Sequence, residues 1–170
     1  MLIGNPYKFA VLFDRVADWN NSIKDNNGLF ALCIDGKLFP DVVINAVVPV
    51  SIYDIKESLI GIPVNEMIYN MDTDILFKSL YKPVFPDVDN NDDNDYRYLL
   101  ATSDLTDIDN LVFAVEGKGM VRILAAKLEY DVAESTHIFD KSAITEVILD
   151  KNEVNQIIRE IEKAIGEFEG

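Results

Sequence analysis

The stretch LVFAVEGKGMVRILAAKLEYD, from Leu111 to Asp131, consists of two apolar runs separated by Gly117-Lys118-Gly119. Near the glycines both faces of each run are apolar, which is typical of strands that bury both faces in the middle of a sheet and carry helices on at least one side. The glycines allow the backbone to reverse with positive φ angles. We therefore predict a central antiparallel hairpin around which the rest of the chain is arranged.

The same stretch has a second interpretation. Gly117-Lys118-Gly119 could begin the G-x-G of a dinucleotide-binding turn, with a helix over Met120–Tyr130 and Asp140 as the ribose-binding acid. However, Arg122 occupies the position of the third glycine, and the chain does not alternate strands and helices. The hairpin is the preferred interpretation.

Further strands are predicted where β-branched and aromatic residues are frequent or where polarity alternates. These segments are Tyr7–Val16, Leu29–Ile34, Lys37–Phe39, Val42–Val50, Tyr96–Thr102 and Ala143–Leu149. Asp35-Gly36 is the strongest short hairpin signal in the chain. Ala133 to Asp140 is poorly patterned.

Three helices are predicted. Ser51 can cap a short helix that ends before Gly61, and a second helix begins at Asn65 and stops at Pro83. Asp150 and Glu153 form a capping-box-like pair at the start of the third. Its apolar residues recur at i, i+3, i+4 and i+7: Val154, Ile157, Ile158, Ile161, Ile165 and Phe168. We therefore expect an α+β fold in a single domain over residues 1–170, with a mostly antiparallel sheet, two helices in the middle of the chain and a C-terminal amphipathic helix packed on the sheet.

The composition limits the classes of partner. The net charge of -15 repels nucleic acid and anionic membranes and attracts a basic partner, while 49% hydrophobic residues argue against disorder. No apolar run approaches the roughly 20 residues that cross a bilayer, and the N-terminus lacks the features of a signal peptide. Cys33, the single cysteine, excludes an internal disulfide and is expected to be a buried apolar residue. These features predict a cytoplasmic protein.

Catalytic and metal sites are not indicated. His137 is the only histidine, and no nucleophile motif accompanies it. One cysteine and one histidine cannot supply the four such ligands of structural zinc. We therefore expect no enzyme activity, no catalytic residue, no metal and no cofactor.

A loop over residues 86–95 is strongly acidic and is predicted to be mobile. Its aspartates match part of a calcium-binding EF-hand loop, but Asp92 replaces the turn glycine and Tyr98 replaces the bidentate glutamate, so the site is incomplete. Aromatic residues flank the loop, and aromatic anchors beside charges are typical of binding hot spots. The predicted partner-binding residues are Asp87, Asp89, Asp92, Asp93, Asp95, Tyr96 and Tyr98.

The N-terminal quarter contains IGNPYKFA at Ile3–Ala10, DWN at Asp18–Asn20, NGLF at Asn27–Phe30 and IDGKLFP at Ile34–Pro40. These motifs resemble the start of the immunity protein family numbered forty-two, from bacterial polymorphic toxin and contact-dependent growth inhibition systems. The motifs look structural, and no functional residue is carried over from the family.

The resemblance implies an antidote that binds one cognate toxin domain and has no chemistry of its own. The acidic charge suits a basic nuclease, whose active site an acidic inhibitor can occlude in place of the phosphates. The alternative that the residues leave open is a small acidic enzyme or a calcium-binding protein.

Overall fold

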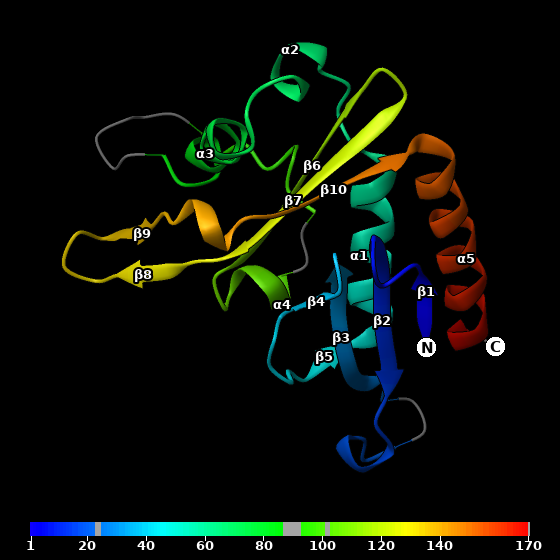
Figure 1. Cartoon of the computed structure of the whole chain (residues 1–170). Helices are drawn as coiled ribbons and strands as arrows, with labels where there is room; N and C mark the ends of the chain where they lie inside the picture. The colour runs from blue at the N-terminus through cyan, green and yellow to red at the C-terminus, as the bar shows by residue number, and fades with distance from the viewer. Residues whose placement is uncertain (23–24, 87–92, 101–102, 170) are drawn as a thin grey trace.

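The structure is a computed structural model and describes residues 1–22, 25–86, 93–100 and 103–169. Two antiparallel sheets and a separate small hairpin make up its β structure (Figure 1). The first sheet has the order β1-β2-β3-β4, with β5 also paired to β3: β1 Leu2–Gly4, β2 Phe9–Arg15, β3 Asn27–Ile34, β4 Lys37–Phe39 and β5 Ala46–Val47. The second has the order β10-β7-β6: β6 Asn110–Gly117, β7 Met120–Lys127 and β10 Thr145–Asp150. The small hairpin pairs β8 Glu129–Asp131 with β9 Thr136–Ile138.

The helices lie outside and between these sheets. They are α1 Val48–Ile60, α2 Glu66–Tyr69, α3 Thr73–Val84, α4 Ser103–Thr106 and α5 Lys151–Glu169, with short 3₁₀ turns η1 Ala17–Trp19 and η2 Lys141–Ala143. In Figure 1, α1 and α5 lie side by side next to the first sheet, whereas α3 lies across the second sheet near the β8–β9 hairpin. None of the described helices combines the length and apolarity needed to cross a membrane.

The predicted central hairpin is confirmed. β6 and β7 pair from Asn110↔Lys127 to Gly117↔Met120, and Lys118 and Gly119 in the turn have φ angles of 56° and 76°. Because Met120–Lys127 is a strand, the helix of the dinucleotide-binding alternative is wrong.

Each face of this hairpin belongs to a different core. Val112 and Ile123 pack into the core that contains the first sheet, α1 and α5. Phe113 and Leu124 pack into a second core with α3, where the Phe113 and Phe77 rings meet edge to face at 5.2 Å. The two apolar faces seen in the sequence therefore join the two halves of the molecule.

The C-terminal helix and its capping box are also confirmed. The backbone N–H of Asp150 donates to Glu153 Oε2 at 2.9 Å, and the N–H of Asn152 donates to Asp150 Oδ1 at 2.7 Å. Val154 and Ile161 are fully buried. The helix thus covers the first core with the predicted face from Val154 to Ile165, while the side chain of Phe168 lies outside the described part of the structure.

The prediction of the middle helices was only partly right. α1 begins at Val48 with Pro49 in its first turn, so Ser51 is inside the helix and does not cap it. Its hydroxyl instead donates to Asp104 Oδ2 at 2.7 Å. This also corrects the expected strand over Val42–Val50, of which β5 is the paired part.

The second predicted helix is broken into α2 and α3 by Arg122. This side chain is buried, and its Nη1 donates to the carbonyl oxygens of Tyr69 and, at 2.8 Å, Met71. Its Nε is paired with Glu146 at 2.5 Å. The carbonyl groups at the break between the two helices therefore accept hydrogen bonds from a buried cation. In a continuous helix the same carbonyl groups would accept from the helix's own N–H groups instead.

One further strand prediction was wrong. No strand forms over Tyr96–Leu100; Leu99 makes a single bridge to Phe113, and residues 101–102 lie outside the described residues. Conversely, the poorly patterned segment from Ala133 contains β9.

A prediction follows from the close approach of Gly117 to Tyr69. A Cβ atom at Gly117 would lie 2.5 Å from Cγ and 2.8 Å from Cβ of Tyr69, too close to the root of that side chain to be relieved by rotation of its tip. We expect Gly117→Ala to lower the free energy of unfolding by about 1–3 kcal/mol. Urea unfolding measures it, with Gly166→Ala as the control. Gly166 is in α5 with open space around it, so alanine there should be neutral or stabilising by up to about 1 kcal/mol. Equal stability of the Gly117 variant and the parent would contradict the packing.

Candidate functional site

The structure describes four of the seven predicted binding residues, and these four fall into two groups. Asp87, Asp89 and Asp92 lie outside the described residues. Asp93 is exposed, and so is Tyr96 at 54%. These two side chains are accessible to a partner.

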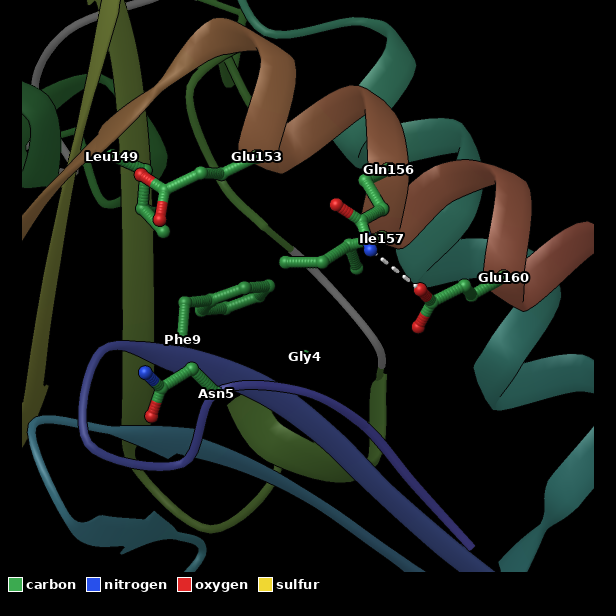
Figure 2. A pocket seen from close by; sticks show the side chains of 8 residues that line it. All are labelled: Gly4, Asn5, Phe9, Leu149, Glu153, Gln156, Ile157 and Glu160. Atoms are coloured by element: carbon green, nitrogen blue, oxygen red, sulfur yellow. Dashed lines mark hydrogen bonds between the residues drawn. The ribbon is translucent and has the colours of Figure 1, made fainter.

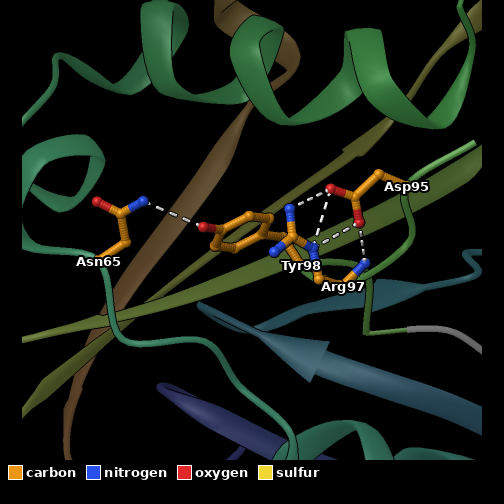
Figure 3. Close-up of polar contacts among 4 residues, drawn as sticks. All are labelled: Asn65, Asp95, Arg97 and Tyr98. Atoms are coloured by element: carbon orange, nitrogen blue, oxygen red, sulfur yellow. Dashed lines mark hydrogen bonds and ion pairs between the residues drawn. The ribbon is translucent and has the colours of Figure 1, made fainter. Parts of the chain in front are cut away.

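Asp95 and Tyr98 have partners within the chain, as Figure 3 shows. Both carboxylate oxygens of Asp95 accept from Arg97, the closest pair being 2.7 Å apart. The Arg97 guanidinium and backbone N–H hold the pKa of that carboxyl below its usual range. The Tyr98 hydroxyl accepts from Asn65 Nδ2 at 3.2 Å, and its ring packs on the second core. Both residues therefore support the local structure.

The end of the acidic segment is attached to the C-terminus of α3. The N–H of Asp95 donates to Pro83 O at 2.8 Å, and Asn94 Nδ2 donates to Val84 O at 2.8 Å. These bonds satisfy carbonyl groups that the helix end leaves without helical partners. They place Asp93 and Tyr96 close to the end of α3.

The β8–β9 hairpin is held against the same helix end by His137. This buried side chain bonds through Nδ1 to the Tyr81 hydroxyl at 2.8 Å and through Nε2 to Asp109 Oδ1 at 2.9 Å. Its ring meets those of Phe85 and Tyr130, each at 5.2 Å. We call Tyr81, Phe85, Asp109, Tyr130 and His137 the His137 cluster.

The geometry of the His137 cluster suits support better than catalysis. Burial raises the pKa of the Tyr81 phenol, so this hydroxyl remains protonated and is a poor nucleophile. A two-stranded hairpin is marginally stable alone, and the two hydrogen bonds of His137 tie it to α3 and to the start of β6. The cluster thereby fixes the position of the hairpin.

Several aromatic and apolar side chains of this cluster and of the β8–β9 hairpin are exposed. Phe85, Tyr130 and Ile138 are 39%, 50% and 51% exposed, and Val132 in the hairpin turn is 81% exposed. In the sequence of the hairpin, the acidic residues Glu129, Asp131 and Glu134 alternate with them. We call the following residues the hairpin face: Phe85, Asp93, Tyr96, Glu129, Tyr130, Asp131, Val132, Glu134 and Ile138.

Sequence reasoning missed the hairpin half of this face. The alternation in Glu129–Asp131 and Thr136–Ile138 is the only sequence signal, and three residues are too few to establish a period. The two halves of the face are about 35 residues apart in the chain and meet at the C-terminal end of α3, where Phe85 contacts His137.

A separate cavity of about 220 Å³ lies between α5 and the first two strands (Figure 2). Its two carboxylates have partners: Glu153 accepts from Lys8 at 2.7 Å, and Glu160 accepts from Gln156 at 2.9 Å. The Lys8 ammonium holds the pKa of Glu153 below its usual range, which keeps this carboxyl ionised and unsuited to donate a proton. Over the described part of the chain, no three His, Cys, Asp or Glu side chains converge as metal ligands do.

Comparison with known proteins agrees with the fold. The crystal structure of CdiI from Burkholderia dolosa AUO158 superposes with a TM-score of 0.78 at 21% identity, covering 96% of this chain and 99% of that chain. No curated protein sequence matches this chain. The sequence profile described as Immunity protein 42 matches residues 1–164, almost the full length. This confirms the resemblance carried by the N-terminal motifs, and the chain belongs to the immunity protein 42 family.

Proposed function

We propose that the protein binds a cognate toxin domain through the hairpin face and neutralises it by occluding its active site, and that this toxin is a basic nuclease that acts in the cytoplasm. Family membership supports the immunity role. The observation that carries the choice of surface is that the acidic segment and the β8–β9 hairpin both contact the end of α3, where the rings of Phe85 and Tyr130 meet His137.

The charge of this surface suits a basic partner. Asp93 lies near the end of α3, and Glu129, Asp131 and Glu134 add negative charge to the β8–β9 hairpin. Because Tyr130 packs on His137, Glu129 and Asp131 project from the opposite face of that hairpin. A nuclease presents cationic groups where it binds phosphates, and carboxylates can take the place of those phosphates. An acidic face therefore competes directly with the substrate of such an enzyme.

The aromatic side chains supply the second requirement of a tight interface. Phe85 and Tyr130 are partly exposed, and the ring of each contacts the buried ring of His137. Because these contacts already fix the two side chains in the free protein, they lose little conformational entropy when a partner binds. Anchors of this kind carry a large share of the binding energy in protein interfaces.

The proposed function is tested with the toxin domain itself. The gene immediately upstream is expected to encode a large surface protein with a variable C-terminal domain, and that domain is the probe. Co-expression should protect cells from the domain, and titration calorimetry should give one binding event with a stoichiometry of one to one. Added nucleic acid substrate should compete with binding. Protection without competition by the substrate would overturn active-site occlusion, and the absence of binding would overturn the proposal as a whole.

A charge-removal variant is predicted to associate more slowly with the toxin domain. Replacing Asp89, Asp92 and Asp93 with asparagine removes three charges and leaves the Asp95–Arg97 pair intact. We expect the association rate to fall by about tenfold at low salt, because exposed charges steer a basic partner and act over a Debye length of about 8 Å at physiological salt. Stopped-flow kinetics at two salt concentrations measures this effect.

The matched control removes three charges elsewhere. Asp14 and Asp18, at the end of the first sheet, and Glu162 on α5 are all exposed. Changing them to Asn, Asn and Gln gives the same net charge at a distance from the hairpin face. If both variants associate equally slowly, only the net charge matters and the acidic segment does not face the toxin.

A further inference from the structure

The second sheet has two outer edges, formed by β6 and β10. Along β6 the main-chain groups that point away from β7 bond to neighbouring segments. Ala114 N–H donates to Tyr98 O at 2.8 Å, and Glu116 N–H donates to Pro63 O at 2.9 Å. The β6 edge is therefore covered by other parts of the chain.

The β10 edge is different. Lys151 N–H donates to Gly119 O at 3.0 Å, directly after the paired residues of β10 and β7. Because the main-chain groups of an antiparallel strand point alternately toward the partner strand and away from it, Glu146 and Ile148 direct their N–H and C=O groups outward. The same alternation turns the N–H of Asp150 outward, where it donates to the capping side chain of α5. Among the described residues, no main-chain group bonds to the outward groups of Glu146 and Ile148.

The features that usually protect an exposed strand from another chain are absent from β10. Such features are short length, proline, lysine and bulges. β10 has 6 residues without proline or lysine, and its pairing with β7 continues without a bulge. Ile148 in the outer half of the strand is apolar and 50% exposed. The Glu146 carboxylate accepts from Arg122 at 2.5 Å and from the Thr73 hydroxyl at 2.6 Å, so its charge is neutralised within the chain. β10 is therefore an edge that can pair with another extended strand.

The pattern of open groups on β10 is complementary to itself. When two copies are placed antiparallel with Val147 opposite Val147 of the other copy, Glu146 of each copy faces Ile148 of the other. The outward N–H and C=O groups of these two residues then pair completely, with two hydrogen bonds donated by each copy. Thr145 lies opposite Leu149 of the other copy, and no two acidic side chains face each other directly. A second copy of this chain thus satisfies every open main-chain group of the edge.

We propose that two copies of this chain pair through β10 into a dimer with twofold symmetry, in which the two second sheets form one continuous antiparallel sheet. Closed twofold dimers are the commonest homo-oligomers. A single strand edge buries little area, so the dimer is weak, with a dissociation constant in the micromolar range or above. The net charge of -15 on each copy opposes association, and added salt strengthens the dimer by screening this repulsion. The inference does not depend on the proposed function.

Sedimentation equilibrium of the full chain, from about 10 µM to about 1 mM, tests the dimer. We expect a reversible equilibrium between monomer and dimer. Ile148→Pro removes one outward N–H from each copy, and with it two of the hydrogen bonds between the copies. Proline is tolerated on an edge strand where the N–H faces solvent, so the monomer should keep its fold. The dissociation constant should rise by about tenfold or more. Ile148→Thr, the matched control, keeps the N–H and should dimerise like the parent protein.

Hydrogen exchange at low and high protein concentration reports the register of the pairing. In dilute protein the amides of Glu146 and Ile148 should exchange fast, while that of Val147, which is bonded to β7, should exchange slowly. At high concentration all three should be slow. A chain that stays monomeric over the whole concentration range, or a dimer in which the Glu146 and Ile148 amides still exchange fast, overturns the proposal. Should Ile148→Pro not fold, the exchange experiment on the parent protein decides.

Discussion

Ile161→Asp is expected to leave the chain unfolded at 25 °C. Ile161 is fully buried in the first core, where α5 packs on α1 and on the first sheet. A buried charge without a partner costs several kcal/mol, and the isoleucine contacts are lost as well. The typical stability of a domain is only about 5–15 kcal/mol. Circular dichroism and urea unfolding of the purified protein measure the effect.

Gln156→Asp is the matched control for this variant. It adds the same charge to the same helix, about one and a half turns earlier, at an exposed position. Loss of its hydrogen bond to Glu160 and the new repulsion between the two carboxylates should cost only a few tenths of a kcal/mol. If Ile161→Asp melts at the temperature of this control, α5 does not cover the core as described.

Tyr130→Ala is expected to weaken binding of the toxin domain by about 2 kcal/mol, which is roughly a 30-fold increase in Kd. Tyr130 is the residue of the hairpin face that is best placed as an anchor. Its ring is half exposed, and it is held by the buried His137 at 5.2 Å. Tyr130→Phe keeps the ring and should retain most of the affinity. Surface plasmon resonance against the immobilised toxin domain measures both variants.

Tyr53 provides a control of equal exposure. It is 51% exposed, against 50% for Tyr130, but it lies on α1, away from the β8–β9 hairpin (Figure 1). Tyr53→Ala should bind like the parent protein. Because Tyr130 also contacts His137, the unfolding free energy of each variant is measured alongside. A Tyr130→Ala protein that is stably folded and binds with the parent affinity would move the interface away from the hairpin.

The local parts of the fold could be predicted because each depends on residues close together in the chain. The β6–β7 turn uses a glycine with a positive φ angle, and the start of α5 uses the Asp150 and Glu153 pair. Both features can therefore be predicted from a few consecutive residues. The break between α2 and α3 could not be predicted in this way. It depends on Arg122, which lies about 50 residues further along the chain. The Arg122 side chain donates to carbonyl groups at the break between the two helices.

The candidate site shows the same division. An acidic segment flanked by aromatic residues could be found in the sequence, because charge and composition are properties of the residues alone. Which of these side chains are exposed depends on the folded chain: Asp95 and Tyr98 are paired with Arg97 and Asn65, while Asp93 and Tyr96 are exposed. It also brought Tyr130 beside Phe85 through His137. The physical reason is that accessibility and hydrogen-bond partners are set by packing between distant segments, and this packing leaves no local pattern in the sequence.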